Sequence, residues 1–276
     1  MNHALSTHFL VNQRLSNVWL DKIYEAGIPA VEIFCAKQHC DWHNKAQVNE
    51  LAHWFSDAPL KLHSLHSPMF NDEVWGRTGP ASIINIADRS KPRRIAAVDE
   101  IKRALEIADQ IPCRYLVQHL GAPVDDFDEG KLEAAFSSLE EISLFARHRG
   151  VEVLLENIPN GLSSAEKLNY FLGITHLNLG YCFDTGHANL MEGIPAAFEM
   201  MKDRIRSTHV HDNNGKDDHH LFPTLSPAGT VNWADTMALL RSREHQYPLL
   251  LELKANPDFP QPLEAIQRIF ENLEKV

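Results

Sequence analysis

Short apolar runs alternate with longer amphipathic stretches along most of this chain. Eight of the runs are rich in valine, isoleucine, leucine and aromatic residues, and each reads as a nearly continuous apolar segment. Parallel strands that are covered on both faces have this character. The eight expected strands lie near residues 7–12, 30–36, 60–66, 114–120, 151–158, 178–184, 205–211 and 248–254.

The stretches between these runs carry the signals of helices. Three of them have apolar residues at three-four spacing, and they cover residues 15–27, 92–111 and 132–150. Gly27 and Gly150 stand where a helix commonly ends, and basic residues precede the second glycine, as expected near a helix C-terminus. Ser164 and Asn232 resemble the N-caps of two further helices.

Eight strand–helix pairs in 276 residues have the size and rhythm of a single-domain (β/α)8 barrel, an α/β fold that would span residues 1–276. An open doubly wound sheet is the alternative, but no GxGxxG motif follows the first strand. Residues 67–91 form the longest stretch without a periodic pattern and carry Phe70, Trp75 and Arg77. A loop of this length is usually functional, so we expect it near the barrel mouth.

Residues able to bind a metal close most of the expected strands. A charge or an imidazole at the end of a buried strand is costly unless it is paired or coordinates an ion. In a barrel of this class the C-terminal strand ends meet at the active site. The candidate ligands are His66, His119, Glu156, Asp184, His187, His209, Asp218, His220 and Glu252.

The segment GYCFDTGH, residues 180–187, is the strongest local motif. Asp184 ends a strand and His187 follows three residues later, so both side chains can face one ion. A carboxylate together with an imidazole suits Mn²⁺, Fe²⁺, Co²⁺ or Zn²⁺ better than Mg²⁺ or Ca²⁺. The alternative is an aspartate that caps a turn beside a surface histidine.

The segment THVHDNNGKDDHH, residues 208–220, is the second motif. His209 and His211 share one face of a strand, because side chains alternate along it. Asp218 and His220 then form an Asp-x-His pair in the loop, and Asp217 with His219 is the competing pair. A disordered loop rich in histidine and aspartate is the alternative to a metal site.

Glu156 and Glu252 end two strongly apolar strands, and a shared cation explains two buried glutamates better than isolated burial does. A salt bridge to Lys254 is the alternative. His66 and His119 end two other strands, and His63 competes with His66. We expect the remaining histidines on solvated faces, among them His3, His39, His43, His53, His148 and His245.

Composition narrows the class of protein. The formal net charge of −11 weighs mildly against a nucleic-acid partner. No apolar run approaches the roughly 20 residues of a membrane span, and the N-terminus has no secretory pattern. The four cysteines form no CxxC pair, which favours a reduced, cytoplasmic setting.

These motifs resemble the xylose isomerase-like TIM-barrel superfamily, which holds sugar isomerases and epimerases alongside endonuclease IV. The resemblance is most specific at LLENIPN, GYCFDTGHANL, THVHDNNGKDDHHL and LLLELK. In the epimerase branch, it implies one metal held by the residues matching Glu156, Asp184, His209 and Glu252. The two glutamates there move protons, and the match to His187 helps hold the sugar.

In the endonuclease IV branch, the resemblance implies three zinc ions held by the matches to all nine candidate ligands. The chain departs from that branch where Asp218-His219-His220 replaces Asp-Arg-His and where Asn213-Asn214 replaces Ser-Lys. The lost arginine and lysine face phosphate in that branch, which puts nuclease activity in doubt.

The sequence therefore favours a metal-dependent isomerase or epimerase of a sugar or polyol, with one to three divalent ions (Mn²⁺, Zn²⁺, Co²⁺ or Fe²⁺). Glu156 and Glu252 would transfer protons through an enediolate. Expected substrate contacts are His66, His119, His187, Lys216, Trp75 and Trp233. The alternatives are hydrolysis of abasic DNA, a binding barrel without turnover, and dehydration or lyase chemistry. We expect a small sugar as the binding partner and no association with a membrane. A homo-oligomer is compatible with the sequence.

Overall fold

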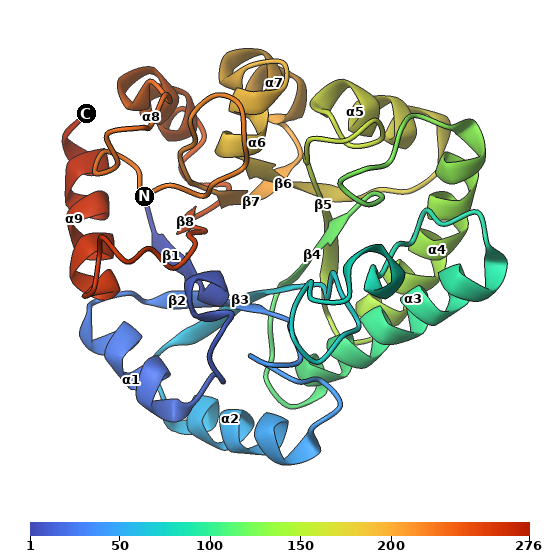
Figure 1. Ribbon diagram of the computed structural model, residues 1–276, viewed down its shortest axis with the longest axis horizontal. Coiled ribbons are helices and arrows are strands. Elements are labelled where there is room, and N and C mark those ends of the chain that lie inside the picture. Colours follow the sequence, from blue (N-terminus) through green and yellow to red (C-terminus); the bar gives the residue numbers. More distant parts are fainter.

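Eight parallel strands form a barrel in the computed structural model, which describes residues 1–276 (Figure 1). Neighbouring strands pair in the order β7-β6-β5-β4-β3-β2-β1-β8. The barrel closes between β7 and β8, the first and last strands in this order. Val210 N donates to Leu250 O at 2.9 Å, and Glu252 N donates to Val210 O at 3.2 Å. The strands are β1 (His3–Ser6), β2 (Ala30–Phe34), β3 (Lys61–His66), β4 (Tyr115–His119), β5 (Glu152–Glu156), β6 (Gly180–Asp184), β7 (Ile205–His209) and β8 (Leu249–Leu251).

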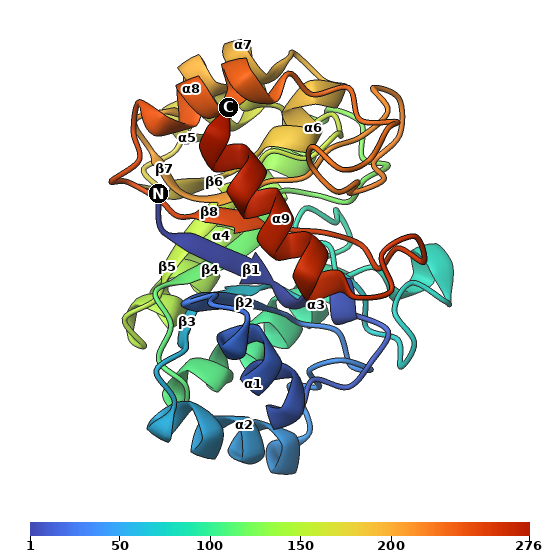
Figure 2. The same cartoon turned by 90° about the vertical axis from the view of Figure 1, so that its left-hand side faces the viewer.

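Helices form a ring around the strands (Figure 1), which confirms the single-domain (β/α)8 barrel. They are α1 (Asn17–Glu25), α2 (Lys45–Asp57), α3 (Lys91–Leu105), α4 (Glu129–Arg147), α5 (Ala165–Ile174), α6 (Thr185–Leu190), α7 (Ile194–Met201), α8 (Trp233–Arg241) and α9 (Pro262–Lys275), with short 3-10 helices η1 (Thr7–Leu10), η2 (Gly79–Ser82) and η3 (Glu106–Asp109). The two chain ends lie on the same side (Figure 2), where His3 stacks on Phe270 of α9 at 4.1 Å. No helix combines the length and the apolar character that crossing a membrane requires.

The expected helix ends are confirmed by their backbone geometry. Gly27 follows α1 with φ +77°, a conformation that glycine adopts without strain. The Ser164 side chain accepts a hydrogen bond from the Lys167 N–H, and Asn232 accepts one from Asp235. These caps satisfy amide groups that would otherwise lack partners at the start of α5 and α8.

The first strand lies earlier than the apolar pattern suggests, so the expectation of a strand at residues 7–12 is wrong. β1 covers His3–Ser6, where its register with β2 and β8 places it. Thr7–Leu10 turn into η1 after Ser6, whose hydroxyl accepts from His8 N. A short apolar run can form a strand or a helical turn. Here Thr7–Leu10 form a turn whose four residues are all buried.

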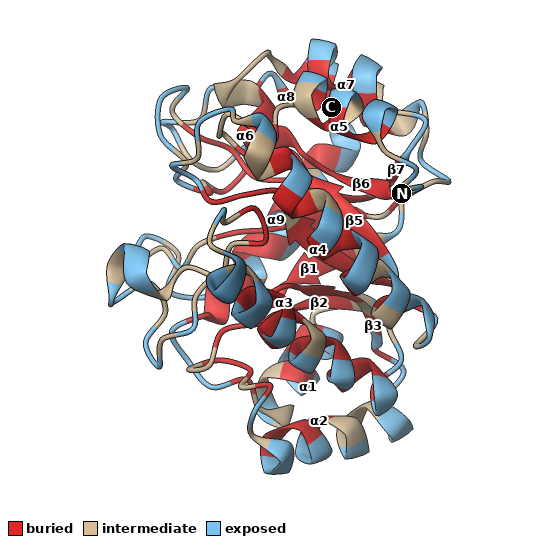
Figure 3. Ribbon diagram, turned by 90° about the vertical axis from the view of Figure 1, so that its right-hand side faces the viewer, coloured by how far each residue is buried: buried red, intermediate tan, exposed pale blue.

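The strands and the inner sides of the helices are buried (Figure 3), and the alternation of side chains along the strands divides this core in two. Leu116, Leu155 and Phe183 face outward into the large core beneath the helices. Val117, Leu154 and Cys182 belong to a small separate cluster with Tyr115, which the strand alternation places inside the barrel. The same alternation turns the strand-ending residues His119, Glu156 and Asp184 inward, toward the mouth.

The segment between β3 and α3 is folded rather than extended. Phe70 and Ile83 form an antiparallel bridge, and the Asp72 carboxylate accepts hydrogen bonds from Gly76 N and Thr78 N. Trp75 packs edge-on against Phe34 at the end of β2, with ring centroids 5.6 Å apart. As expected, this segment lies at the barrel mouth.

Candidate active site

Four strand ends bring acidic and imidazole groups to one point in the barrel. Glu156, Asp184 and His209 end β5, β6 and β7, and Glu252 directly follows β8. One ligand atom from each of the four lies within 4.8 Å of the others, and all four residues are buried. His209 Nδ1 is 3.0 Å from Glu156 Oε1, 3.3 Å from Glu252 Oε2 and 4.0 Å from Asp184 Oδ2.

Main-chain carbonyl groups hold three of the site histidines in a fixed orientation. The Nδ1 atoms of His66, His187 and His220 lie 2.9, 2.9 and 3.1 Å from the carbonyl oxygens of Ser67, Asn157 and Glu252. An Nδ1–H that donates to a carbonyl leaves Nε2 free as a ligand atom. The Nε2 atom of each of the three faces a carboxylate in the site.

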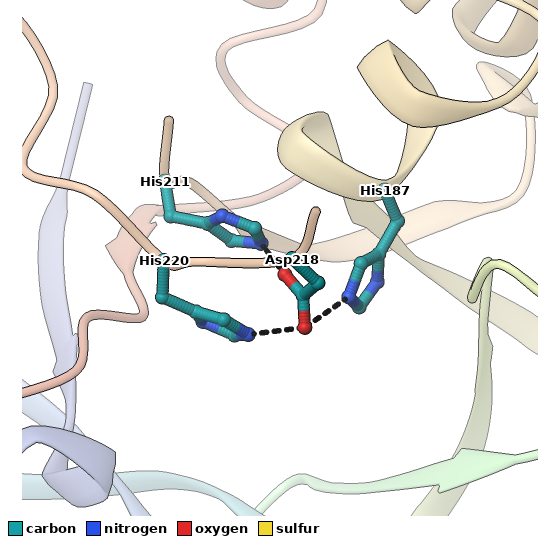
Figure 4. Close-up of side chains that lie close together, drawn as sticks. All are labelled: His187, His211, Asp218 and His220. Atoms are coloured by element: carbon teal, nitrogen blue, oxygen red, sulfur yellow. Dashed lines mark hydrogen bonds and ion pairs between the residues drawn. The ribbon is translucent and has the colours of Figure 1, made fainter. Parts of the chain in front are cut away.

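A second cluster surrounds the Asp218 carboxylate (Figure 4). His220 Nε2 and His187 Nε2 lie 3.1 and 3.6 Å from Asp218 Oδ2, and His211 Nε2 lies 3.9 Å from Oδ1. His211 also lies 3.1 Å from Asp184 Oδ2, so it joins the second cluster to the first. The backbone of His220 has φ +47°, a left-handed conformation that histidine tolerates better than most residues.

His66 and His119 complete the arrangement on the opposite side of Glu156. His119 Nε2 lies 2.9 Å and His66 Nε2 lies 3.4 Å from Glu156 Oε2. All nine residues that the sequence singled out therefore meet at the C-terminal mouth of the barrel. His187 lies in the first turn of α6 rather than in a loop, because Asp184 also serves as the N-cap of that helix and accepts from His187 N.

Burial and neighbouring charges shift the pKa values of Glu156 and Glu252 in opposite directions. Burial raises the pKa of Glu252 to about 7, more than nearby His209 lowers it. Burial also raises the pKa of Glu156, but His209, His119 and His187 outweigh it and hold this pKa well below its usual range. One carboxyl is thus poised to take up a proton while the other stays ionised.

The donor set fits a divalent cation. His209 Nε2 lies 3.1 Å from Glu32 Oε1, so an Nε2–H directed at Glu32 leaves Nδ1 facing three carboxylates. A lone pair opposite carboxylate oxygens is repulsive unless a proton or a metal ion lies between them. Two glutamates, an aspartate and a histidine form a mixed N/O set of the kind that Mn²⁺, Fe²⁺, Co²⁺ and Zn²⁺ accept.

Four groups at the site were not among the nine candidate ligands, and two of them, Glu32 and His8, were not considered in the sequence at all. Glu32 lies in the middle of β2, fully buried, and contacts His209 and the Ser64 hydroxyl. His8 and Lys254 line the pocket, and His211 joins the second cluster. A glutamate inside the apolar run AVEIF was a usable signal for Glu32, whereas nothing local marked His8.

Two expected substrate contacts lie away from the pocket. Lys216 is exposed in the loop after β7, and Trp233 is buried with its Nε1–H donating to Asp212 Oδ2 at 2.8 Å. Asp212 also accepts from the amides of Thr230 and Val231, so the tryptophan anchors this loop. Trp75 does line the pocket.

The structure also decides between neighbouring residues. Asp218 and His220 point into the site, while Asp217 and His219 are exposed. His66 faces the mouth, whereas His63 contacts Ser207 at 3.2 Å and lines a cavity with Met1 and Arg114. The expectation that His39 is solvated is wrong, because it is fully buried between Gln13 O and Thr7 Oγ1.

The pocket at the mouth has a volume of about 160 Å³. Pockets for drug-sized ligands usually measure about 300–1,000 Å³, so this one suits a smaller molecule. Phe34, Met69 and Trp75 pack together as an aromatic wall of the pocket, and His8 and His66 lie against Phe34. The lining residues are His8, Phe34, His66, Met69, Trp75, His119, Pro123, Glu156, Ile158, Pro159, His187, Asp218, His220, Glu252 and Lys254.

Several known proteins are similar to this chain in sequence, in fold or in both. An uncharacterised protein of Methanocaldococcus jannaschii is 30% identical over 264 residues, covering 91% of this chain and 84% of its own. A crystal structure of a D-tagatose 3-epimerase-like protein superposes with a TM-score of 0.76 at 27% identity, covering 100% of this chain and 99% of that one. The IolI protein, solved with a zinc atom, superposes with a TM-score of 0.77 at 15% identity and covers 99% and 98% of the two chains, a likeness of fold. The xylose isomerase-like TIM-barrel family model matches residues 20–276, and the chain belongs to that family.

Proposed function

We propose that this protein is a divalent-metal-dependent enzyme that isomerises or epimerises a small sugar or polyol. The observation that carries the proposal is the pair of buried glutamates, Glu156 and Glu252, at one pocket with their ligand atoms within 4.8 Å of each other. Two carboxyl groups on one small pocket can remove a proton from a substrate carbon and return it to a neighbouring carbon or to the opposite face.

Glu156, Asp184, His209 and Glu252 would hold the cation. When bound, the ion supplies Lewis-acid polarisation of the substrate carbonyl. The chain's own groups then handle the protons. Glu252, a carboxylate that lines the pocket, accepts the proton α to the carbonyl, and the substrate passes through an enediolate. In an isomerisation Glu252, now protonated, returns the proton to the neighbouring carbon. In an epimerisation Glu156 returns one to the opposite face after taking it up from His66, whose Nε2 lies 3.4 Å from Glu156 Oε2.

The sugar class is supported by the D-tagatose 3-epimerase-like structure, at 27% identity over the whole chain. The pocket itself also favours a neutral substrate. Lys254 is its one lining lysine or arginine, and the ammonium group already donates to Asp218 O at 2.9 Å. No cluster of lysine and arginine side chains is available there to bind a phosphate.

The test is exchange of the substrate α-proton in deuterium oxide, followed by NMR. The metal-loaded protein is offered D-tagatose, D-psicose, D-fructose and their phosphates. Glu156→Gln and Glu252→Gln should each reduce exchange by at least about 10²-fold, because glutamine cannot act as a base. Glu100→Gln, a carboxylate bonded to Trp42 and His43 far from the pocket, is the matched control and should keep its activity. Metal content is measured in the same samples.

A second ion, held by His187, His211, Asp218 and His220, is also proposed. With it, an endonuclease IV-like hydrolysis of abasic DNA becomes the second candidate function, favoured by the convergence of all nine predicted ligands. The net charge of −11 and the single lysine at the pocket weigh against it. Nicking of abasic DNA by protein with three zinc ions, without proton exchange on any sugar, would replace the isomerase proposal. Absence of both activities would leave a binding barrel.

A further inference from the structure

His8 is a buried imidazole without hydrogen-bond partners. It lies in η1, directly after β1, and is 3% exposed. Neither Nδ1 nor Nε2 has a partner, although both atoms are shielded from solvent. A buried polar atom left without a partner typically costs about 1–3 kcal/mol, so such atoms call for an explanation.

Aromatic packing, rather than hydrogen bonding, fixes the His8 ring. The ring stacks on Phe34 with centroids 4.5 Å apart and an interplanar angle of 22°. Trp75 and His220 meet it edge-on at 5.5 and 5.0 Å. The ring is therefore held in place with both nitrogen atoms unpartnered, in a residue that lines the pocket.

A second unpartnered donor lies beside His8. Trp75 Nε1 is buried without an acceptor, and both residues line the pocket at the barrel mouth together with Phe34 and Met69. His8 Nδ1 is 3.7 Å from Glu252 Oε1, so these donors adjoin the glutamate assigned to proton transfer. Protein sites for carbohydrates commonly combine two kinds of contact: hydrogen bonds to the hydroxyl groups and aromatic rings that pack against the C–H faces of the sugar.

We propose that His8 and Trp75 form a hydroxyl-binding subsite on the aromatic wall of the pocket, which selects neutral polyhydroxy ligands and positions them beside Glu252. The inference rests on the proposed function for the role of Glu252, but the binding of hydroxyl groups does not require turnover. His8 would contact the substrate through a ring nitrogen, and Trp75 would donate its indole N–H while its ring covers the carbon chain.

The test compares ligand binding by wild-type, His8→Phe and Trp75→Phe proteins, all loaded with metal. Both substitutions keep an aromatic ring and remove the ring nitrogens. Calorimetric titration uses D-tagatose, D-psicose and D-fructose together with two polyols that cannot be isomerised, D-mannitol and D-glucitol. Each variant should bind at least one of these ligands about 3–10-fold more weakly, the effect of one lost hydrogen bond. Metal content should be unchanged in both variants, and His8→Phe should melt at the same or a higher temperature, because no hydrogen bond within the protein is lost.

Trp42→Phe is the matched control, since Trp42 Nε1 donates to Glu100 Oε2 at 2.9 Å away from the pocket. It should lower the melting temperature without changing affinity. Unchanged affinity in both pocket variants overturns the subsite, as does a wild-type protein that binds none of the five ligands. Loss of metal from His8→Phe would make His8 a metal ligand and also overturns it. If polyols bind and the variants weaken them while no ketose exchanges a proton, the subsite stands and the isomerase proposal fails.

Discussion

At the scale of single residues, His209 shows how a side chain is held from both ends. Its Nε2 atom lies 3.1 Å from Glu32 Oε1, and Glu32 in turn accepts from the Ser64 hydroxyl at 2.8 Å. Its Nδ1 atom faces the cluster of Glu156, Asp184 and Glu252. A carboxylate behind a ligating imidazole orients the ring and raises its basicity. Glu32 is therefore a positioning residue for the proposed metal site.

Replacement Glu32→Gln should weaken binding of the cation about 10–100-fold, because the amide cannot supply the charge behind His209. Competition with a calibrated chelator measures the affinity. Glu100→Gln, which removes a carboxylate outside the site, serves as the comparison and should leave metal affinity unchanged. Equal affinities in wild type and Glu32→Gln would reduce Glu32 to a packing residue of the barrel interior.

His39 should make stability depend on pH. Burial lowers its pKa to about 4, and the ring accepts from the Thr7 hydroxyl while donating to Gln13 O. Above pH 6.5 the folded and unfolded states are both neutral at this residue. As the pH falls from about 6.5 to 4, the unfolded state takes up a proton that the folded state refuses, so stability is lost. The shift corresponds to about 3 kcal/mol.

Urea unfolding at pH 7.5 and 4.5 measures this loss in wild type and in His39→Asn. The variant should start less stable but lose about 2.5 kcal/mol less between the two pH values, because the folded state is itself partly protonated near pH 4. The difference isolates His39 from the other histidines, which titrate in both proteins. Parallel losses in the two proteins would show that His39 does not contribute to the acid sensitivity.

At the scale of elements, the junction of β6 and α6 combines three tasks in a few residues. Asp184 ends the strand, caps the helix and faces the proposed metal site, while His187 one turn later reaches the second cluster. Gly186 lies between them, against the face of His211. A Cβ atom at Gly186 would stand 2.0 Å from His211 Cε1, far inside contact distance.

Gly186→Ala should therefore push His211 out of place, destabilise the fold by about 1–3 kcal/mol and remove the second ion. The matched control is Gly173→Ala near the end of α5, where a Cβ meets no atom within 4 Å. That change should be neutral or stabilising by about 0.4–1 kcal/mol. Urea unfolding and metal analysis of both variants report the outcome. A Gly186→Ala protein with wild-type stability and wild-type metal content would contradict the role assigned to this glycine.

Element patterns predicted much of this architecture, and their failures are local. Seven strands lie where their apolar runs stand, because buried parallel strands carry a continuous apolar signal. The first strand was misplaced, since THFL is apolar whether it forms a strand or the turn η1. Helix α6 was missed because TGHANL is short and carries no amphipathic pattern. The role of His8 could not be predicted from the sequence, because the aromatic rings that pack against it come from the end of β2 and from distant loops.

At the scale of the whole molecule, the barrel gathers residues that are far apart in sequence. The first cluster draws on β5, β6, β7 and the residue after β8, and the second on α6 and the segment that follows β7. The ligand-rich strand ends could be predicted because a (β/α)8 barrel directs all of them to one mouth. The positions of Lys216 and Trp233 could not, because loop conformation depends on contacts such as the one between Trp233 and Asp212.

Removal of metal should destabilise the entire barrel. The ion would neutralise the buried carboxylates of Glu156, Asp184 and Glu252, and ligand at 100 times its dissociation constant stabilises the folded state by about 2.7 kcal/mol. Thermal melting with chelator and with increasing Mn²⁺ or Zn²⁺ tests this, and the melting temperature should rise by about 5–10 °C. In Asp184→Asn the rise should be smaller. A melting temperature that ignores metal in the wild-type protein would contradict the proposed cation site.

Glu252 is the last residue of the four-residue cluster to be synthesised. This residue follows the last strand, and its amide donates to Val210 O at the seam where the barrel closes. During synthesis the earlier strand ends emerge first, but a chain without β8 has neither the final carboxylate nor a closed barrel. Truncated or partly translated copies therefore cannot assemble the four-residue cluster, and the proposed cation would bind only after β8 has closed the barrel.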